Sequence, residues 1–159
     1  MKSILVIGIG SRIMTDDAIG VHLVEDLEKL DTNPAIRYIT GETDVDYCIG
    51  EIPYYDYIVV IDAFLSGKKA GEATIVPFHE LKDETEECLY SMHGIHLLKV
   101  IRHAENLPEG TLIGIEPFDI NYGLTLSDAL QSRYPNILRE VQKYLSDILK
   151  NREEGQKNA

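Results

Sequence analysis

The sequence predicts an α/β fold: a three-layer sandwich in which a five-stranded, mostly parallel sheet carries helices on both faces. The first sign is an unbroken apolar run from Ile4 to Ile7, which is typical of a strand buried on both faces. The second is the helical spacing that follows, where apolar residues recur mostly three or four positions apart from Ile19 to Leu30. The third is the repetition of this strand–helix alternation along the chain, which favours parallel strands joined by right-handed crossovers.

The first half of the chain is expected to contain three strands. Residues 3–9 contain the apolar run, and residues 36–40 alternate apolar and polar side chains as a half-buried strand does. A helix is expected over 17–30, and Thr43 or Asp44 could cap a short helix that ends near residue 49. Residues 54–61 are rich in β-branched side chains and predict a buried third strand with Asp62 at its carboxyl end.

The second half is expected to begin with an edge strand at 72–78, because Pro77 closes it. After a weakly patterned acidic stretch, residues 91–93 open a helix, and a fifth strand follows at 111–115. The last expected element is an amphipathic helix from about 124 to 149, in which Pro135 marks a kink or a break. We therefore expect a single domain at 1–150 and a polar, frayed tail at 151–159.

Composition narrows the classes of function. The chain has 159 residues, enough for one domain with a substantial core, and its net charge of −12 opposes binding to nucleic acid. It contains no apolar run long enough to span a bilayer and no signal-peptide pattern, so we expect a cytoplasmic protein, and a monomer. Cys48 and Cys88 form no CxxC motif and are expected to be reduced thiols without a chemical role.

A glycine-rich loop follows the first strand. Gly8 and Gly10 resemble the first half of a dinucleotide-binding fingerprint, but the third glycine of that motif would fall on Ile13. Two adjacent carboxylates follow in the same loop, and they would repel a pyrophosphate and favour a cation instead. Glu42, at the end of the second strand, could contact a ribose, and it alone keeps a nucleotide-binding α/β protein as an alternative.

Two carboxylates and one imidazole are predicted at one edge of the sheet. Asp17 follows the first strand, Asp62 ends the third, and His93 opens the helix after the fourth. Because the carboxyl ends of parallel strands lie at the same edge, we expect these three side chains to converge. Such a set suits a divalent transition metal, and its donors leave manganese, nickel and zinc open. Taken singly, each residue could instead cap a turn or a helix N-terminus.

Other reactive groups lack matching partners. The serines form no Ser-His-Asp arrangement, and neither cysteine has a histidine in a matching motif. The remaining histidines are expected on the surface or in partly buried, satisfied positions: His22, His79, His96 and His103.

Four short motifs occur in an order that is similar to that of one protein family. The first is Gly8-Ile-Gly10-Ser11 followed by Asp16-Asp17, and the second is an apolar strand that ends in Asp62-Ala63. The others are Ser91-Met92-His93, and Gly114-Ile-Glu-Pro117 with Gly123-Leu-Thr125. Together they resemble the hydrogenase maturation endopeptidases over essentially the whole chain apart from its tail.

This resemblance implies a peptidase that removes the C-terminal extension from the precursor of a nickel–iron hydrogenase large subunit after nickel insertion. By position, it implies Asp17, Asp62 and His93 as nickel ligands and catalytic centre, with Asp16 orienting His93 or a water molecule. The resemblance also implies that the nickel belongs to the precursor and serves for recognition, and that cadmium or zinc could occupy the same site. A non-catalytic nickel-binding chaperone for hydrogenase assembly, on the same fold, is the alternative.

Three positions depart from the family pattern. Ser11 stands where the family has Asn, and Asp17 stands where many members have Glu, so its carboxylate has a shorter reach. Glu42 replaces the second glycine of a Gly-Gly-Thr-like element. This puts a carboxylate where the family has bare backbone, and it could change which precursor is accepted.

Overall fold

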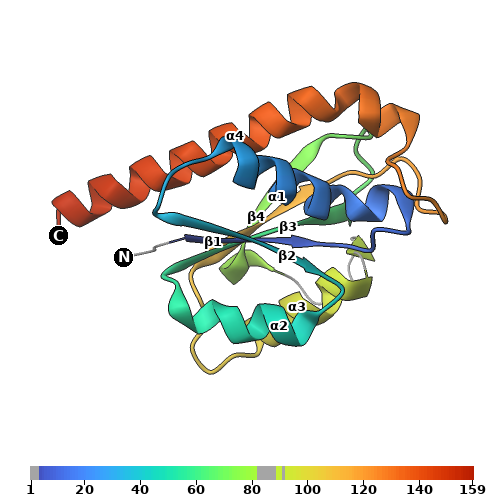
Figure 1. Ribbon diagram of the computed structural model, residues 1–159. Coiled ribbons are helices and arrows are strands. Elements are labelled where there is room, and N and C mark those ends of the chain that lie inside the picture. The colour runs from blue at the N-terminus through green and yellow to red at the C-terminus, as the bar shows by residue number, and fades with distance from the viewer. Residues whose placement is uncertain (1–3, 82–88, 91) are drawn as a thin grey trace.

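A mixed sheet forms the middle layer of the fold in the computed structural model, which describes residues 4–81, 89–90 and 92–159 (Figure 1). Its strands are β1 (Ile4–Ile9), β2 (Ile36–Glu42), β3 (Tyr57–Leu65), β4 (Ala73–Pro77) and β6 (Gly110–Ile115). They lie in the order β2-β1-β3-β6-β4, with β4 antiparallel to β6 and the other neighbours parallel. A two-residue strand, β5 (Leu89–Tyr90), pairs antiparallel with the end of β3. The predicted five-stranded, mostly parallel sheet is therefore confirmed, with β5 as a short addition.

Helices cover both faces of this sheet (Figure 1). They are α1 (Ile19–Leu30), α2 (Val45–Glu51), α3 (Met92–Arg102) and α4 (Asp128–Lys157), with 3₁₀ turns η1 (Thr15–Ala18), η2 (Ile52–Tyr54) and η3 (Phe78–Glu80). On one face, Leu27 of α1 and Val141 of α4 join a buried apolar cluster with the strands. On the other face, Cys48 of α2 and Leu97 of α3 do the same. The strands are apolar on both sides because each side packs against helices.

Side-chain caps start two of the helices. The Asp44 carboxylate accepts a hydrogen bond of 3.0 Å from the backbone N–H of Tyr47, so the predicted cap of α2 is confirmed at Asp44. The Ser127 hydroxyl accepts one of 3.3 Å from the backbone N–H of Leu130 and caps α4. The α4 helix thus begins at Asp128, a few residues after the expected start.

The third strand differs from its prediction at both ends. Pro53 lies in η2, and β3 begins only at Tyr57. The strand then continues to Leu65 because β6 pairs with it as far as Ala63 and β5 pairs with its last two residues. Asp62 therefore lies inside β3, opposite Gly114 of β6, and does not follow the strand.

The C-terminal helix is longer than predicted. It runs without a break through Pro135 and ends at Lys157, so most of the expected frayed tail is helical. Arg152 explains this extension: its guanidinium lies 3.0 Å from the carboxylate of Glu109 and 5.0 Å from the ring centre of Tyr57. Within the part of the chain that the structure describes, none of the helices combines the length and apolar character that a membrane span needs.

Candidate functional site

The turn that follows β1 lies close against the carboxyl edge of the sheet. η1 contacts β3, and α1 begins directly after η1. Gly20 permits this approach because a Cβ there would lie 2.1 Å from the carbonyl oxygen of Ile61. Gly10 has φ = 139°, and a Cβ there would lie 1.8 Å from the backbone oxygen of Asp17. These two glycines bring the turn that carries Asp17 onto the part of β3 that carries Asp62.

Asp17 and Asp62 are both buried carboxylates. Asp62 has no exposed surface, and its Oδ1 accepts a hydrogen bond of 2.8 Å from the backbone N–H of Ala63. Asp17 is 7% exposed, and its Oδ2 accepts one of 2.9 Å from the backbone N–H of Ser11. Among the described residues, no cationic side chain forms an ion pair with Asp17. The buried charge of Asp17 therefore has little compensation among the described residues, which is costly and typical of a site that binds a cation.

The neighbouring Asp16 has a different environment. Its Oδ2 accepts hydrogen bonds from the backbone N–H groups of Phe118 and Asp119, both at 2.9 Å, and from the Ser127 hydroxyl at 2.7 Å. Its Oδ1 accepts a fourth, of 2.7 Å, from the backbone N–H of Ser127. Asp16 is fully buried, and these bonds join the turn after β1 to the loop before α4. They show a structural role for Asp16, whereas its predicted role of orienting His93 or a water molecule stays a prediction.

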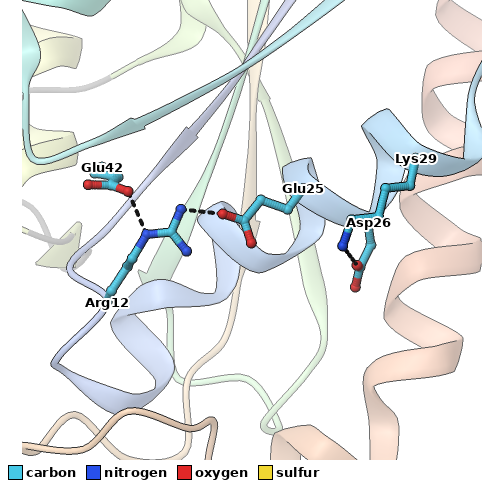
Figure 2. Close-up of polar contacts among 5 residues, drawn as sticks. All are labelled: Arg12, Glu25, Asp26, Lys29 and Glu42. Atoms are coloured by element: carbon cyan, nitrogen blue, oxygen red, sulfur yellow. Dashed lines mark hydrogen bonds and ion pairs between the residues drawn. The ribbon is translucent and has the colours of Figure 1, made fainter.

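Arg12 holds the other side of the same loop (Figure 2). Its guanidinium lies between the carboxylate of Glu42, at 2.5 Å, and that of Glu25 on α1. The hydrogen bond with Arg12 lowers the pKa of Glu25, and the two carboxylates raise the pKa of Arg12. Arg12 thus ties the loop to the end of β2 and to α1, while Asp16 ties it to the loop before α4.

The backbone at Glu42 explains why a glycine suits this position. Glu42 has φ = 50°, in the left-handed region that side chains other than glycine rarely adopt. Its carbonyl oxygen accepts a hydrogen bond of 3.0 Å from the backbone N–H of Gly10, so this conformation helps to hold the loop. The ion pair with Arg12 offsets part of the backbone strain that a glycine would avoid.

The third predicted ligand is only partly described. His93 lies in the first turn of α3, and its side chain is outside the described residues. Among the residues whose side chains are described, no group of three histidines, cysteines or acids could hold a metal ion. The turn of Asp17 and the strand of Asp62 lie together at one edge, whereas the convergence of His93 with them stays a prediction.

The remaining reactive side chains behave as expected. His79, His96 and His103 are exposed, and His22 is partly buried. Cys48 is a buried free thiol, and burial raises its pKa to about 12. Because a nucleophilic cysteine must be a thiolate, this pKa excludes Cys48 as a nucleophile near neutral pH. Cys88 lies outside the described residues.

Sequence reasoning missed the ion pairs of Arg12 and the hydrogen bonds that join Asp16 to the loop between β6 and α4, although a family-like motif spans that loop. The two partners of Arg12 lie 13 and 30 positions away in the chain, and the loop residues bound by Asp16 lie 102 to 111 positions away. The sequence signal that could have found these contacts is the pair of adjacent acids, Asp16 and Asp17, between an apolar strand and an apolar helix, because two carboxylates held close to a core need two separate sets of partners.

Comparisons with known proteins identify the family. The family model described as hydrogenase maturation protease matches residues 21–144. The hydrogenase 2 maturation protease of Escherichia coli (strain K12) is 29% identical over 147 residues, which cover 87% of each chain. The hydrogenase expression/formation protein HupD of Rhizobium leguminosarum bv. viciae is 30% identical over 122 residues, 74% of this chain and 60% of that protein.

Solved structures agree in fold. The hydrogenase maturating endopeptidase HybD from E. coli superposes with a TM-score of 0.74 and 25% identity, over 91% of this chain and 93% of that one. The [NiFe] hydrogenase maturation protease HybD from Thermococcus kodakarensis gives 0.72 and 24%, over 89% and 98%. The family-model match covers most of the chain, and the α/β fold is the same as in these structures. The protein is therefore a peptidase that belongs to the hydrogenase maturation protease family.

Proposed function

We propose that this peptidase removes the C-terminal extension from the large-subunit precursor of a nickel–iron hydrogenase after nickel has been inserted. The observation that carries the proposal is the pair of buried carboxylates, Asp17 and Asp62, at the carboxyl edge of the sheet in a chain of this family. Family membership supports the substrate class. The buried negative charge supports a cation as the feature of the substrate that is recognised.

The donor set fits nickel carried by the precursor. Asp17 and Asp62 supply carboxylate oxygens and His93 would supply the imidazole nitrogen, a combination suited to a divalent transition metal. The backbone N–H groups of Ser11 and Ala63 hold one oxygen of each carboxylate, which limits rotation of both side chains. Nickel in this position would polarise the scissile carbonyl group or lower the pKa of a water molecule.

The chain's own residues prepare this site, and the part of the chain that the structure describes shows no activated serine or cysteine nucleophile. The hydrogen bonds of Asp16 and the ion pairs of Arg12 hold the loop before Asp17 from both sides. With Cys48 protonated and buried, we propose that water attacks the scissile bond. We also propose that the protein acts as a cytoplasmic monomer, in keeping with its charge of −12.

The test compares nickel-loaded and nickel-free precursor. Purified precursor of the large subunit is incubated with the protein, and the mass of the subunit is measured by mass spectrometry. We expect the mass to fall by that of the extension only when nickel is present. Equal shortening of both precursors would remove nickel as the recognition feature. Binding of nickel-loaded precursor without any shortening would favour the assembly-chaperone alternative.

A further inference from the structure

We infer that two loops beside the candidate site form one docking surface for the precursor, and that the surface accepts an apolar polypeptide segment with net positive charge. The loops are residues 11–15, after β1, and residues 118–124, before α4, and we call them the docking loops. The inference rests on the proposed function, because it names the part of the protein that receives the same substrate.

Hydrogen bonds join the docking loops into one body. The backbone N–H of Gly123 donates to the carbonyl oxygen of Ile13 at 3.0 Å, and the N–H of Thr15 donates to that of Gly123 at 3.1 Å. The Thr15 hydroxyl donates to the carbonyl oxygen of Asp119 at 2.8 Å and accepts from the N–H of Asn121 at 3.0 Å. The four bonds of Asp16 complete the connection. Loops held in this way lose little conformational entropy on binding, which favours their use as a contact surface.

The docking loops expose apolar side chains. Tyr122 is 87% exposed, Leu124 75% and Phe118 70%, and Ile13 and Ile120 are also exposed. Beside Leu124 lies an open hollow of about 430 Å³, also lined by His22 and Leu126. Aromatic and aliphatic residues grouped on braced loops are unusual for a free surface and typical of a contact with another polypeptide.

The surface is continuous with the candidate site. Asp16 binds one docking loop and precedes Asp17 in the chain, and the backbone N–H of Ser11, in the other docking loop, donates to Asp17. A precursor bound to the docking loops would therefore lie next to Asp17 and Asp62. This position suits a substrate whose scissile bond must reach the same edge of the sheet.

The negative charge at this edge favours a positively charged partner. Residues 116–127 contain no lysine, arginine or histidine, and Arg12 is already paired with Glu25 and Glu42. Asp17 and Asp119 form no ion pair among the described side chains, and their charge favours a cationic partner. A second copy of this chain would bring the same negative charge, and so would a membrane of anionic lipids. A basic, apolar segment of the precursor is the complementary occupant.

The chain offers a matched control for a test. Tyr122→Ser with Leu124→Ser removes one tyrosine and one leucine from the docking loops. Tyr54→Ser with Leu30→Ser makes the same chemical change at the opposite edge, where these side chains are 77% and 58% exposed. Tyr54 ends η2 just before β3, and Leu30 ends α1, so both lie away from the candidate site.

Two measurements separate docking from catalysis. Binding of nickel-free precursor gives a Kd without cleavage or a metal contact, and processing of nickel-loaded precursor gives KM and kcat. We expect the docking-loop pair to raise Kd and KM by about tenfold or more with kcat within about twofold, and the control pair to change each by less than about twofold. Circular dichroism and melting temperature establish that both variants are folded.

The outcomes are distinct. If nickel-loaded precursor is shortened but both pairs leave Kd and KM unchanged, or change them equally, the docking surface is refuted and the peptidase proposal stands. If no precursor is shortened but the docking-loop pair alone weakens binding, the docking surface stands and the proposed cleavage fails. If the unmodified protein binds neither nickel-free nor nickel-loaded precursor, both proposals fail. If it fails to bind nickel-free precursor but shortens the nickel-loaded one, the docking surface is refuted and the peptidase proposal stands. Self-association in sedimentation that the docking-loop pair abolishes would assign the surface to a second copy and overturn the inference.

Discussion

Charged side chains are paired differently at the two edges of the sheet, where the parallel strands begin and where they end. At the edge where the parallel strands begin, opposite or polar groups are paired. Arg152 of α4 contacts Glu109 and the ring of Tyr57, and the hydroxyl of Tyr38 donates to the carboxylate of Asp31 at 2.5 Å. Burial and the bond to Asp31 raise the pKa of Tyr38, so it remains a neutral donor. These contacts pair the charges of Arg152 and Glu109 and keep the Tyr38 hydroxyl neutral.

At the edge where the strands end, some charged side chains stabilise loops and others are candidate ligands. Asp16 satisfies four donors, and Arg12 satisfies two carboxylates, so both stabilise loops. Asp17, between them, accepts one hydrogen bond and has no described ion pair. Burial alone therefore does not identify a ligand-binding carboxylate. Asp17, the candidate ligand, differs from Asp16 and Arg12 in how little of its charge is compensated by described partners.

Removing the charge of Asp62 is expected to have the largest effect. Asn in Asp62→Asn is nearly isosteric and can still accept the N–H of Ala63, but it lacks the charge that binds a cation. We expect processing of nickel-loaded precursor to fall by about a hundredfold or more, since loss of an outer-shell partner alone often costs ten- to a hundredfold. Melting temperature should change little. A processing-competent Asp62→Asn protein would contradict the metal assignment.

The same test applies to the predicted imidazole ligand. His93→Ala should strongly impair processing, because it removes the nitrogen donor of the set, whereas His96→Ala, on an exposed position of the same helix, should do little. The shortened fraction of the precursor is measured for both variants together with their melting temperatures. Equal activity of the two variants would show that His93 is not a ligand.

Substitutions at Asp16 and Asp17 compare a loop-stabilising carboxylate with a predicted metal ligand. In Asp16→Asn, the amide group must face at least one of the donors on Phe118, Asp119 or Ser127, so we expect a loss of about 3 kcal/mol in the free energy of unfolding. Asp17→Asn can keep its bond with Ser11 and should change stability by less than about 1 kcal/mol while processing is lost. Denaturant melts and processing assays of both variants test this. The reverse pattern would exchange the two roles.

Much of this comparison could be predicted from the sequence, and the rest depends on distant partners. The β-branched run before Asp62 and the loop after Ile9 place two carboxylates at one edge because apolar runs and turns are local signals. The pairing of Arg12, the bonds of Asp16 and the extension of α4 arise from contacts 13 to 111 positions apart. The last turns of α4 carry few apolar residues, so periodicity alone ended the helix near 149.

At the opposite edge, Arg152→Met should affect stability and leave processing unchanged. Methionine keeps an apolar stem over Tyr57 but loses the ion pair with Glu109, so the expected loss is about 1 kcal/mol at most. Amide hydrogen exchange should become faster at residues 151–157, which the side chain anchors. A processing defect in a stable Arg152→Met protein would show that the two edges are not independent.

The smallest expected effect concerns Arg12 and its pH dependence. Arg12→Met removes two ion pairs between partly exposed side chains, and we expect a loss below about 1 kcal/mol at pH 7 that decreases in high salt. Arg12 lowers the pKa of Glu25 below its ordinary value of 4.5. A carboxylate with a lowered pKa contributes stability above its unfolded pKa and loses it as the pH falls through the folded value.

The difference in stability between the original protein and Arg12→Met should therefore be present at pH 7 and shrink as Glu25 becomes protonated below its ordinary pKa. Denaturant melts from neutral to acidic pH measure this difference. Arg139→Met supplies a control with the same change of charge, because Arg139 donates a hydrogen bond to Asn136 on its own helix and forms no ion pair among the described side chains. A gap that is constant with pH would mean that Arg12 holds the loop by packing. Its charge would then add nothing to the bracing of the edge that carries Asp17.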